Sequence, residues 1–144
     1  PERRARQCEL DLIELLAEFR APLDPVALSE PLFAYWSRPT PLPGADAFLR
    51  SVRDRPVCIV SNIDDADLAS ALSSLGWSFE RIVTSEQCRA YKPRTGMFAA
   101  ALARLGCPAE RVLHVGDSLG SDVTGAAAAD IACACTCAAA RIHD

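Results

Sequence analysis

The sequence predicts an α/β fold built on a parallel sheet. From residue 57 onward, short apolar runs rich in β-branched residues alternate with segments whose apolar residues recur at helical spacing. The run at 57–60 is apolar on both faces, which is typical of a strand buried within a parallel sheet. Strands that alternate with helices favour parallel pairing through right-handed crossovers. A chain of 144 residues is long enough for one domain with a core.

The elements follow one another in a regular order. The stretch at 6–19 carries Leu12, Leu15, Leu16 and Phe19 on one helical face, and a second apolar patch at 32–36 follows two helix-breaking prolines. Gly76 and Gly106 each stop a helical stripe. We predict helices at 45–53, 68–75, 97–105 and 122–129, and strands at 57–60, 81–84, 112–115 and 131–137.

A proline-rich turn at 39–44 is the clearest boundary in the chain. The sequence before it predicts helices only, and the sequence after it predicts alternating strands and helices. We therefore expect a helical part at 1–40 and an α/β part at 41–144.

Composition excludes several classes of function. The net charge of −4 and the pI near 5.2 provide no basic face for nucleic acid or an anionic membrane surface. No apolar run approaches the roughly 20 residues of a membrane span, and no signal peptide is visible. We expect a cytoplasmic protein with reduced thiols, bound neither to nucleic acid nor to a membrane.

Three of the seven cysteines, Cys133, Cys135 and Cys137, form a Cys-x-Cys-x-Cys run. Alternate residues of a strand share one face, so these thiols suit the apolar side of a strand. A soft-metal site is the alternative, although such sites usually combine two separate Cys pairs.

Polar residues follow three of the predicted strands. Ser61 and Asn62 end the first strand, Lys92 lies in the loop after the second, and Asp117 and Asp122 follow the third. The carboxyl ends of parallel strands meet at one edge of the sheet, where ligands of α/β folds bind. A hydroxyl, a lysine and two carboxylates at one edge suit a Mg²⁺-assisted phosphoryl-transfer site.

These residues also resemble motifs of the haloacid dehalogenase (HAD) superfamily. The segment Cys58-Ile59-Val60-Ser61-Asn62 resembles motif II, Tyr91-Lys92-Pro93 resembles motif III, and the GDSxxSD pattern at 116–122 resembles motif IV. The resemblance covers about residues 41–132. It implies a three-layer, parallel-sheet, Rossmann-like core, with residues 1–40 as the remnant of an α-helical cap.

The resemblance also implies roles for the site residues. Ser61, Asn62 and Lys92 would bind the phosphate of a small phosphorylated substrate, and Lys92 and Asp122 would be the catalytic residues. Asp117 would hold Mg²⁺, and Asp122 would hold the metal directly, act through water, or orient Lys92. The implied activity is that of a Mg²⁺-dependent phosphatase. Neither the substrate nor the oligomeric state can be read from the sequence.

The family's motif I, a strand followed by Asp-x-Asp with the nucleophilic aspartate, has no match upstream of Ser61. Asp65-Ala66-Asp67 has the spacing but lies beyond motif II, on an incipient helix. In the family the motif I strand lies between the strands of motifs II and IV. We therefore expect residues 41–144 to lack that strand and the chain to be an inactive fragment of the enzyme.

Two other functions stay open. A 2-haloacid dehalogenase of the same superfamily would tolerate Ser61-Asn62, but the acidic pair of motif IV argues against it. A non-catalytic HAD-like binding or regulatory domain would fit the missing motif I. His114, in the middle of an apolar strand, is expected to be a packed core histidine.

Overall fold

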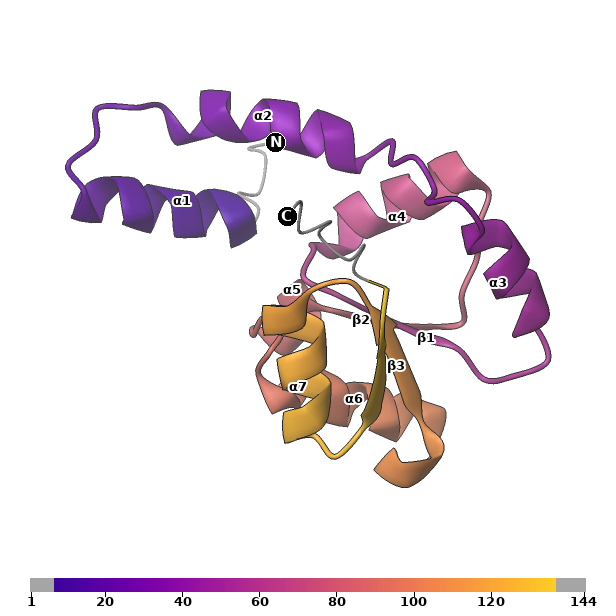
Figure 1. Cartoon of the computed structure of the whole chain (residues 1–144). Helices are drawn as coiled ribbons and strands as arrows, with labels where there is room; N and C mark the ends of the chain where they lie inside the picture. Colours follow the sequence, from indigo (N-terminus) through magenta and orange to yellow (C-terminus); the bar gives the residue numbers. More distant parts are fainter. Residues whose placement is uncertain (1–6, 137–144) are drawn as a thin grey trace, which may run out of the picture. The chain divides into compact units, whose positions relative to one another are not determined.

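A computed structural model describes residues 7–136 and shows helices that alternate with parallel strands (Figure 1). The fold is therefore α/β, as predicted. The helices are α1 (Gln7–Glu18), α2 (Pro25–Trp36), α3 (Ala45–Ser51), α4 (Asp65–Leu75), α5 (Ser85–Cys88), α6 (Thr95–Leu105) and α7 (Thr124–Ala128). The strands are β1 (Cys58–Ser61), β2 (Arg81–Thr84), β3 (Leu113–Gly116) and β4 (Ala132–Cys135). A 3₁₀ turn, η1 (Ala109–Arg111), precedes β3, and a π-helical turn, η2 (Leu119–Val123), follows it.

The chain divides into two compact units. The first comprises Pro1–Arg55 and Ile63–Ser78, and the second comprises Pro56–Asn62 and Phe79–Asp144. Helices α3 and α4 thus group with α1 and α2, whereas all four strands lie in the second unit. The expected division into 1–40 and 41–144 stays a prediction.

The first unit is helical. The Val26 N–H donates a 3.0 Å hydrogen bond to the Asp24 carboxylate, and Pro25 occupies the first helical position, so α2 begins with a regular N-cap. Helix α2 contacts α1 and α4. Its one buried large apolar side chain, Phe33, packs edge-on against Trp36 with ring centroids 5.6 Å apart.

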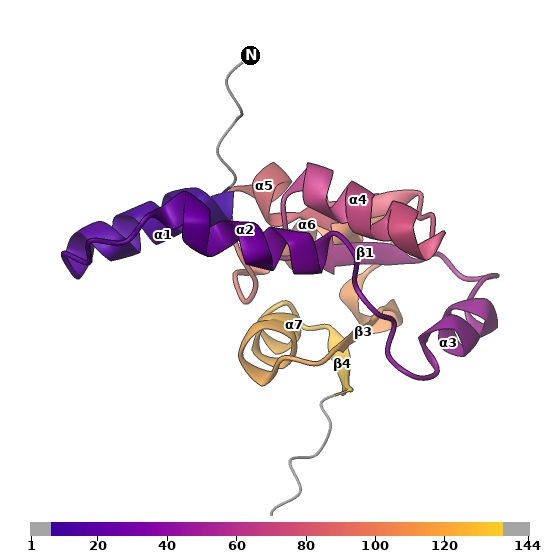
Figure 2. The same ribbon diagram turned by 90° about the horizontal axis from the view of Figure 1, so that it is seen from above.

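The second unit contains two separate two-stranded parallel sheets. β1 pairs with β2, from Cys58 opposite Arg81 to Ser61 opposite Thr84. β3 pairs with β4 in the same sense (Figure 2). Among the residues that the structure describes, no ladder joins β1 to β3. The predicted strands therefore form two parallel pairs.

This pairing changes the burial of the strands. All four β1 residues are half-buried, and on β3 the side chains of Leu113 and Val115 are 61% and 38% exposed. The expected burial is therefore wrong for the face of β3 that carries Leu113 and Val115, whereas β1 is partly buried on both faces. Within residues 7–136, β1 and β3 each have a neighbouring strand on only one edge, which leaves side chains beside the open edge more accessible.

Helix α6 joins the two halves of this unit. Its neighbouring residues Met97 and Phe98 are 0% and 1% exposed and belong to different core clusters. Met97 packs with Val83 of β2, whereas Phe98 packs with Ala126 of α7. A Cβ at Gly125 would lie 2.4 Å from the Phe98 ring, so only glycine allows α7 to approach α6 this closely.

Candidate functional site

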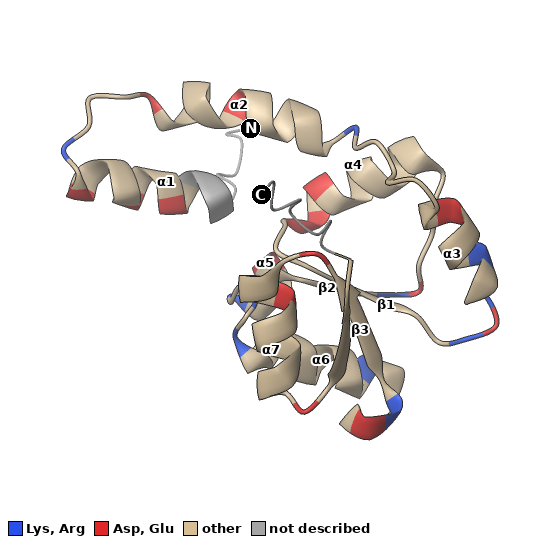
Figure 3. Ribbon diagram, viewed as in Figure 1, with Lys and Arg blue, Asp and Glu red and all other residues tan. Residues whose placement is uncertain are grey.

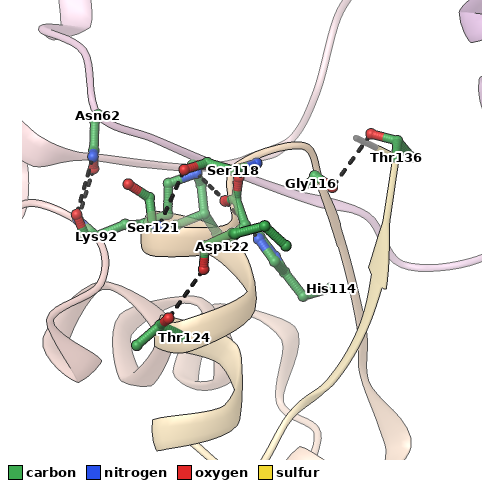
Figure 4. Close-up of polar contacts among 11 residues, drawn as sticks. Asn62, Lys92, His114, Gly116, Ser118, Ser121, Asp122, Thr124 and Thr136 are labelled. Carbon is green, nitrogen blue, oxygen red and sulfur yellow. Dashed lines mark hydrogen bonds and ion pairs between the residues drawn. The ribbon is translucent and has the colours of Figure 1, made fainter. Parts of the chain in front are cut away.

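All five residues predicted for the site lie in the second unit. Ser61 is the last residue of β1 and Asn62 follows it, whereas Lys92 lies between α5 and α6. Asp117 directly follows β3, and Asp122 lies in the π-helical turn η2. The structure brings Asn62, Lys92 and Asp122 into one hydrogen-bonded network (Figure 4).

Lys92 and Asp122 form a buried ion pair. The Lys92 Nζ lies 2.6 Å from the Asp122 Oδ1, and the two side chains are 12% and 5% exposed. The same ammonium donates a 3.0 Å hydrogen bond to the Val60 carbonyl oxygen of β1. An ammonium has three donors. Two of them are used on described residues, and no acceptor for the third lies among residues 7–136.

The turn η2 directs the Asp122 side chain back toward β3. The Asp122 N–H donates to the Ser118 carbonyl oxygen at 2.8 Å, and the Ser121 N–H donates to the Ser118 Oγ at 3.1 Å. Ser118 therefore caps the turn with its side chain and anchors it with its carbonyl. A Cβ at Gly116 would lie 2.4 Å from the Asp122 Cγ, so glycine is required where this carboxylate crosses the strand end.

Three donors converge on the Asp122 carboxylate. Its Oδ1 accepts from the Lys92 Nζ and contacts the His114 Nε2 at 2.9 Å, and its Oδ2 accepts from the Ser118 N–H at 3.1 Å. Burial alone would raise the pKa of Asp122. The hydrogen bonds from Lys92, His114 and Ser118 outweigh burial and hold the pKa at about 2. The carboxylate is therefore ionised at neutral pH.

His114 does more than the core packing expected of it. Its ring packs edge-on against Phe98, with centroids 5.2 Å apart, but its Nε2 also reaches Asp122. A sequence signal for this contact exists. His114 and Gly116 are two residues apart on a strand and so share one face. The glycine marks the close approach of another segment on that face.

Asn62 holds the backbone of the Lys92 loop. Its Oδ1 accepts from the Lys92 N–H at 2.7 Å, and its Nδ2 donates to the Lys92 carbonyl oxygen at 3.2 Å. These two bonds join residues 30 positions apart in the chain. The side-chain amide of Asn62 is thus engaged with the protein itself.

Asp117 and Ser61 contribute no side chain to this network among the described residues. Asp117 is exposed, and none of residues 7–136 forms a hydrogen bond or ion pair with its carboxylate. Ser61 is half-buried at the end of β1. Asp65 and Asp67, which have the spacing of motif I, occupy the first turn of α4 in the first unit. Acids there suit the helix N-terminus.

The cysteine run lies partly on β4. Cys133 is half-buried and packs against the core cluster of Phe98, whereas Cys135 is exposed; Cys137 lies outside the described residues. Burial, and then the nearby Asp122 charge, raise the pKa of the Cys133 thiol. Over residues 7–136 no cluster of three or more His, Cys, Asp and Glu side chains is arranged to hold a metal ion.

Comparison with known proteins identifies the family. The sequence model of the haloacid dehalogenase-like hydrolases matches residues 3–130. The chain belongs to the HAD-like hydrolase family. Hydrolase chemistry is therefore the class of reaction that its relatives perform.

Two curated relatives of this HAD-like hydrolase are named as phosphatases or nucleotidases. The ribulose-1,5-bisphosphate 5-phosphatase of Halopiger xanaduensis is 31% identical over 122 residues, which are 79% of this chain and 50% of the relative. The pyrimidine 5′-nucleotidase YjjG of Escherichia coli is 36% identical over 97 residues, 65% of this chain and 43% of the relative. The chain thus spans about half the length of these relatives or less.

Solved structures agree on the fold. The L-2-haloacid dehalogenase of Xanthobacter autotrophicus matches with a TM-score of 0.72 and 25% identity, covering 88% of this chain and 52% of that one. A HAD phosphatase from Thermococcus onnurineus matches with a TM-score of 0.58 and 24% identity, covering 84% and 56%. The α/β architecture is thus that of the HAD core.

No helix within residues 7–136 is long and apolar enough to cross a membrane.

Proposed function

We propose that this HAD-like hydrolase is part of a cytoplasmic, Mg²⁺-dependent phosphatase that acts on a small phosphorylated metabolite. Two curated relatives whose names specify phosphate substrates support the proposal. The acidic sequence, with acids and bases interspersed along both units (Figure 3), suits a small substrate better than nucleic acid or an anionic membrane.

The buried ion pair of Lys92 with Asp122 is the observation that carries the proposal. Asp122 and the Val60 carbonyl oxygen hold the ammonium at the carboxyl end of β1. A prepositioned cation with one remaining donor can neutralise a phosphoryl oxygen without reorganising during the reaction. The Ser61 hydroxyl and the Asn62 N–H are at the same strand end, and we assign them to the other phosphoryl oxygens.

Mg²⁺ fits Asp117 better than Asp122. Mg²⁺ often binds one or two carboxylates and completes its octahedron with waters and substrate phosphate. The exposed Asp117 carboxylate has no competing partner among the described residues. Asp122 already accepts three hydrogen bonds, so direct coordination would have to compete with them. We therefore assign the metal to Asp117 and the placement of Lys92 to Asp122. Bound there, Mg²⁺ would shield the negative charge of the phosphate.

The nucleophile is proposed to come from a strand that this sequence does not include. In the part of the chain that the structure describes, β1 and β3 each pair on one edge only, and their apolar side chains are incompletely buried. One more parallel strand between them would join the two sheets and cover part of the apolar surface beside their open edges. Its carboxyl end would lie at the same edge as Ser61 and Asp117, where an aspartate could attack phosphorus.

The test is Mg²⁺-dependent hydrolysis of an aryl phosphate by the protein of the complete native reading frame, beside the 144-residue chain. We expect turnover from the former and none from the latter. Lys92→Met and Asp117→Asn should each lower kcat by roughly 100-fold or more. Asp54→Asn, at a side chain that is 92% exposed in the first unit, is the matched control and should leave kcat unchanged.

Equal turnover by the 144-residue chain would refute the missing nucleophile but not the phosphatase activity. An inactive complete protein would count against a phosphatase and favour a non-catalytic domain. The fold match to a 2-haloacid dehalogenase makes that activity the second candidate. Release of halide from a 2-haloacid, with no Mg²⁺ requirement and no aryl phosphate hydrolysis, would support it.

A further inference from the structure

His114 occupies a position that the proposed reaction leaves unexplained. Its side chain is 13% exposed, in a strand where its neighbours Leu113 and Val115 are apolar. Core packing would need no polar atom here. Yet the Nε2 lies 2.9 Å from the Asp122 Oδ1, the same oxygen that accepts from the Lys92 ammonium. Figure 4 shows the His114 ring beside the Asp122 side chain.

The contact matters because His114 and Lys92 share the Oδ1 of Asp122. The Ser118 N–H fixes Oδ2 alone, and a carboxylate held through one oxygen can still rotate about its terminal torsion. A second fixed donor on Oδ1 removes that freedom. His114, on β3, then fixes the position of Oδ1. The Lys92 ammonium donates to both Oδ1 and the Val60 carbonyl oxygen, so its position is fixed as well.

We propose that His114 is a positioning residue that fixes the Lys92 ammonium by way of Asp122. The inference rests on the proposed phosphatase for its purpose, because a lysine that neutralises phosphate must be held in place. It does not rest on that function for its geometry. His114 donates through Nε2, which requires the proton on that nitrogen whenever the ring is neutral.

Two substitutions separate this role from packing. His114→Phe keeps an aromatic ring against Phe98 but removes the donor. His114→Gln loses the ring but places an amide donor near the position of Nε2. A positioning role predicts that glutamine preserves the placement of Lys92 and phenylalanine does not, whereas a packing role predicts the reverse. Val115→Ala, on the same strand and outside the network, controls for disturbance of β3.

The composition provides a clean readout, because Lys92 is the only lysine in the chain. In a chain labelled with ¹⁵N-lysine, the correlation of the ammonium protons with Nζ reports on this residue alone. We expect one slowly exchanging signal from the wild type, Val115→Ala and His114→Gln. We expect His114→Phe to lose it or to move it toward the position of a solvent-exposed lysine. Far-UV circular dichroism of each variant confirms that the chain is folded.

Each other result overturns the proposal. No ordered signal in the wild type would show that Lys92 is not held. Retention in His114→Phe with loss in His114→Gln would assign His114 to packing, and loss in Val115→Ala as well would assign the effect to the strand. The spectra need no turnover, so a complete protein without phosphatase activity would refute the proposed function and leave this inference standing.

Discussion

Replacing Asp122 by asparagine tests the electrostatics of the site. The amide keeps the size of the side chain and removes its charge. The network lowers the pKa of Asp122 from 3.8 to about 2. At about 1.4 kcal/mol per pKa unit, this shift corresponds to about 2 kcal/mol of folding free energy at neutral pH. Asp122 is only 4% exposed, so solvent screens the interaction little.

The direction of the pH dependence follows from the lowered pKa. A carboxylate whose pKa is depressed by folding contributes fully above its unfolded pKa, near 3.8, and the contribution is lost as the pH falls through about 2. Between pH 6 and pH 2 the wild type should therefore lose about 2 kcal/mol more stability than Asp122→Asn. At pH 6 the variant should be the less stable, because it leaves the buried Lys92 ammonium without its counter-ion.

The assay is urea unfolding followed by far-UV circular dichroism at several pH values from 6 to 2. Asp117→Asn is the matched control, since it removes the same charge from an exposed position five residues earlier in the chain. Its stability should follow that of the wild type at every pH. The reasoning is refuted if the difference between the wild type and Asp122→Asn stays constant over this range, or if Asp117→Asn gives the same profile.

Two further substitutions test the packing and the loop contacts. Gly125→Ala would place a Cβ 2.4 Å from the buried Phe98 ring, so we expect a loss of roughly 1–3 kcal/mol in urea unfolding. Gly96→Ala, which meets nothing within 4 Å, should be neutral or slightly stabilising, and equal losses would contradict the packing account. Asn62→Ala removes both bonds to the Lys92 backbone and should cost about 1 kcal/mol or more. Asn62→Asp keeps the acceptor and loses the donor, so its stability should lie between those of Asn62→Ala and the wild type. A stability outside that interval would count against this pair of bonds.

Local patterns predicted the regular elements well. The expected strands at 57–60, 81–84 and 112–115 are confirmed as β1, β2 and β3, each shifted by at most one residue. Gly76 and Gly106 end α4 and α6 in the left-handed conformation, with φ of 67° and 63°. These features depend on side-chain type and on the conformational freedom of glycine within a few residues, so the sequence states them directly.

Two other features were not predicted by the local sequence patterns. The helix expected to begin at residue 122 is preceded by the π-helical turn Leu119–Val123, so Asp122 lies in the turn and not at the start of α7. The short helix α5 was not predicted. In both places the backbone follows a hydrogen bond to a capping side chain, from Ser121 to Ser118 and from Gln87 to Thr84. The spacing of apolar residues along the sequence does not reveal such bonds.

The sequence by itself determined which residues can carry the chemistry. The order and spacing of Ser61, Lys92 and Asp117 pointed to one edge of an α/β fold, because polar residues after apolar strands converge there whatever the details of packing. Only the tertiary structure decided how they are held. The bonds from Asn62 to Lys92 and from His114 to Asp122, and the separation of β1 from β3, join or divide segments distant in the chain. Such contacts depend on which surfaces meet after folding, and a periodicity of two or 3.6 residues carries no information about that.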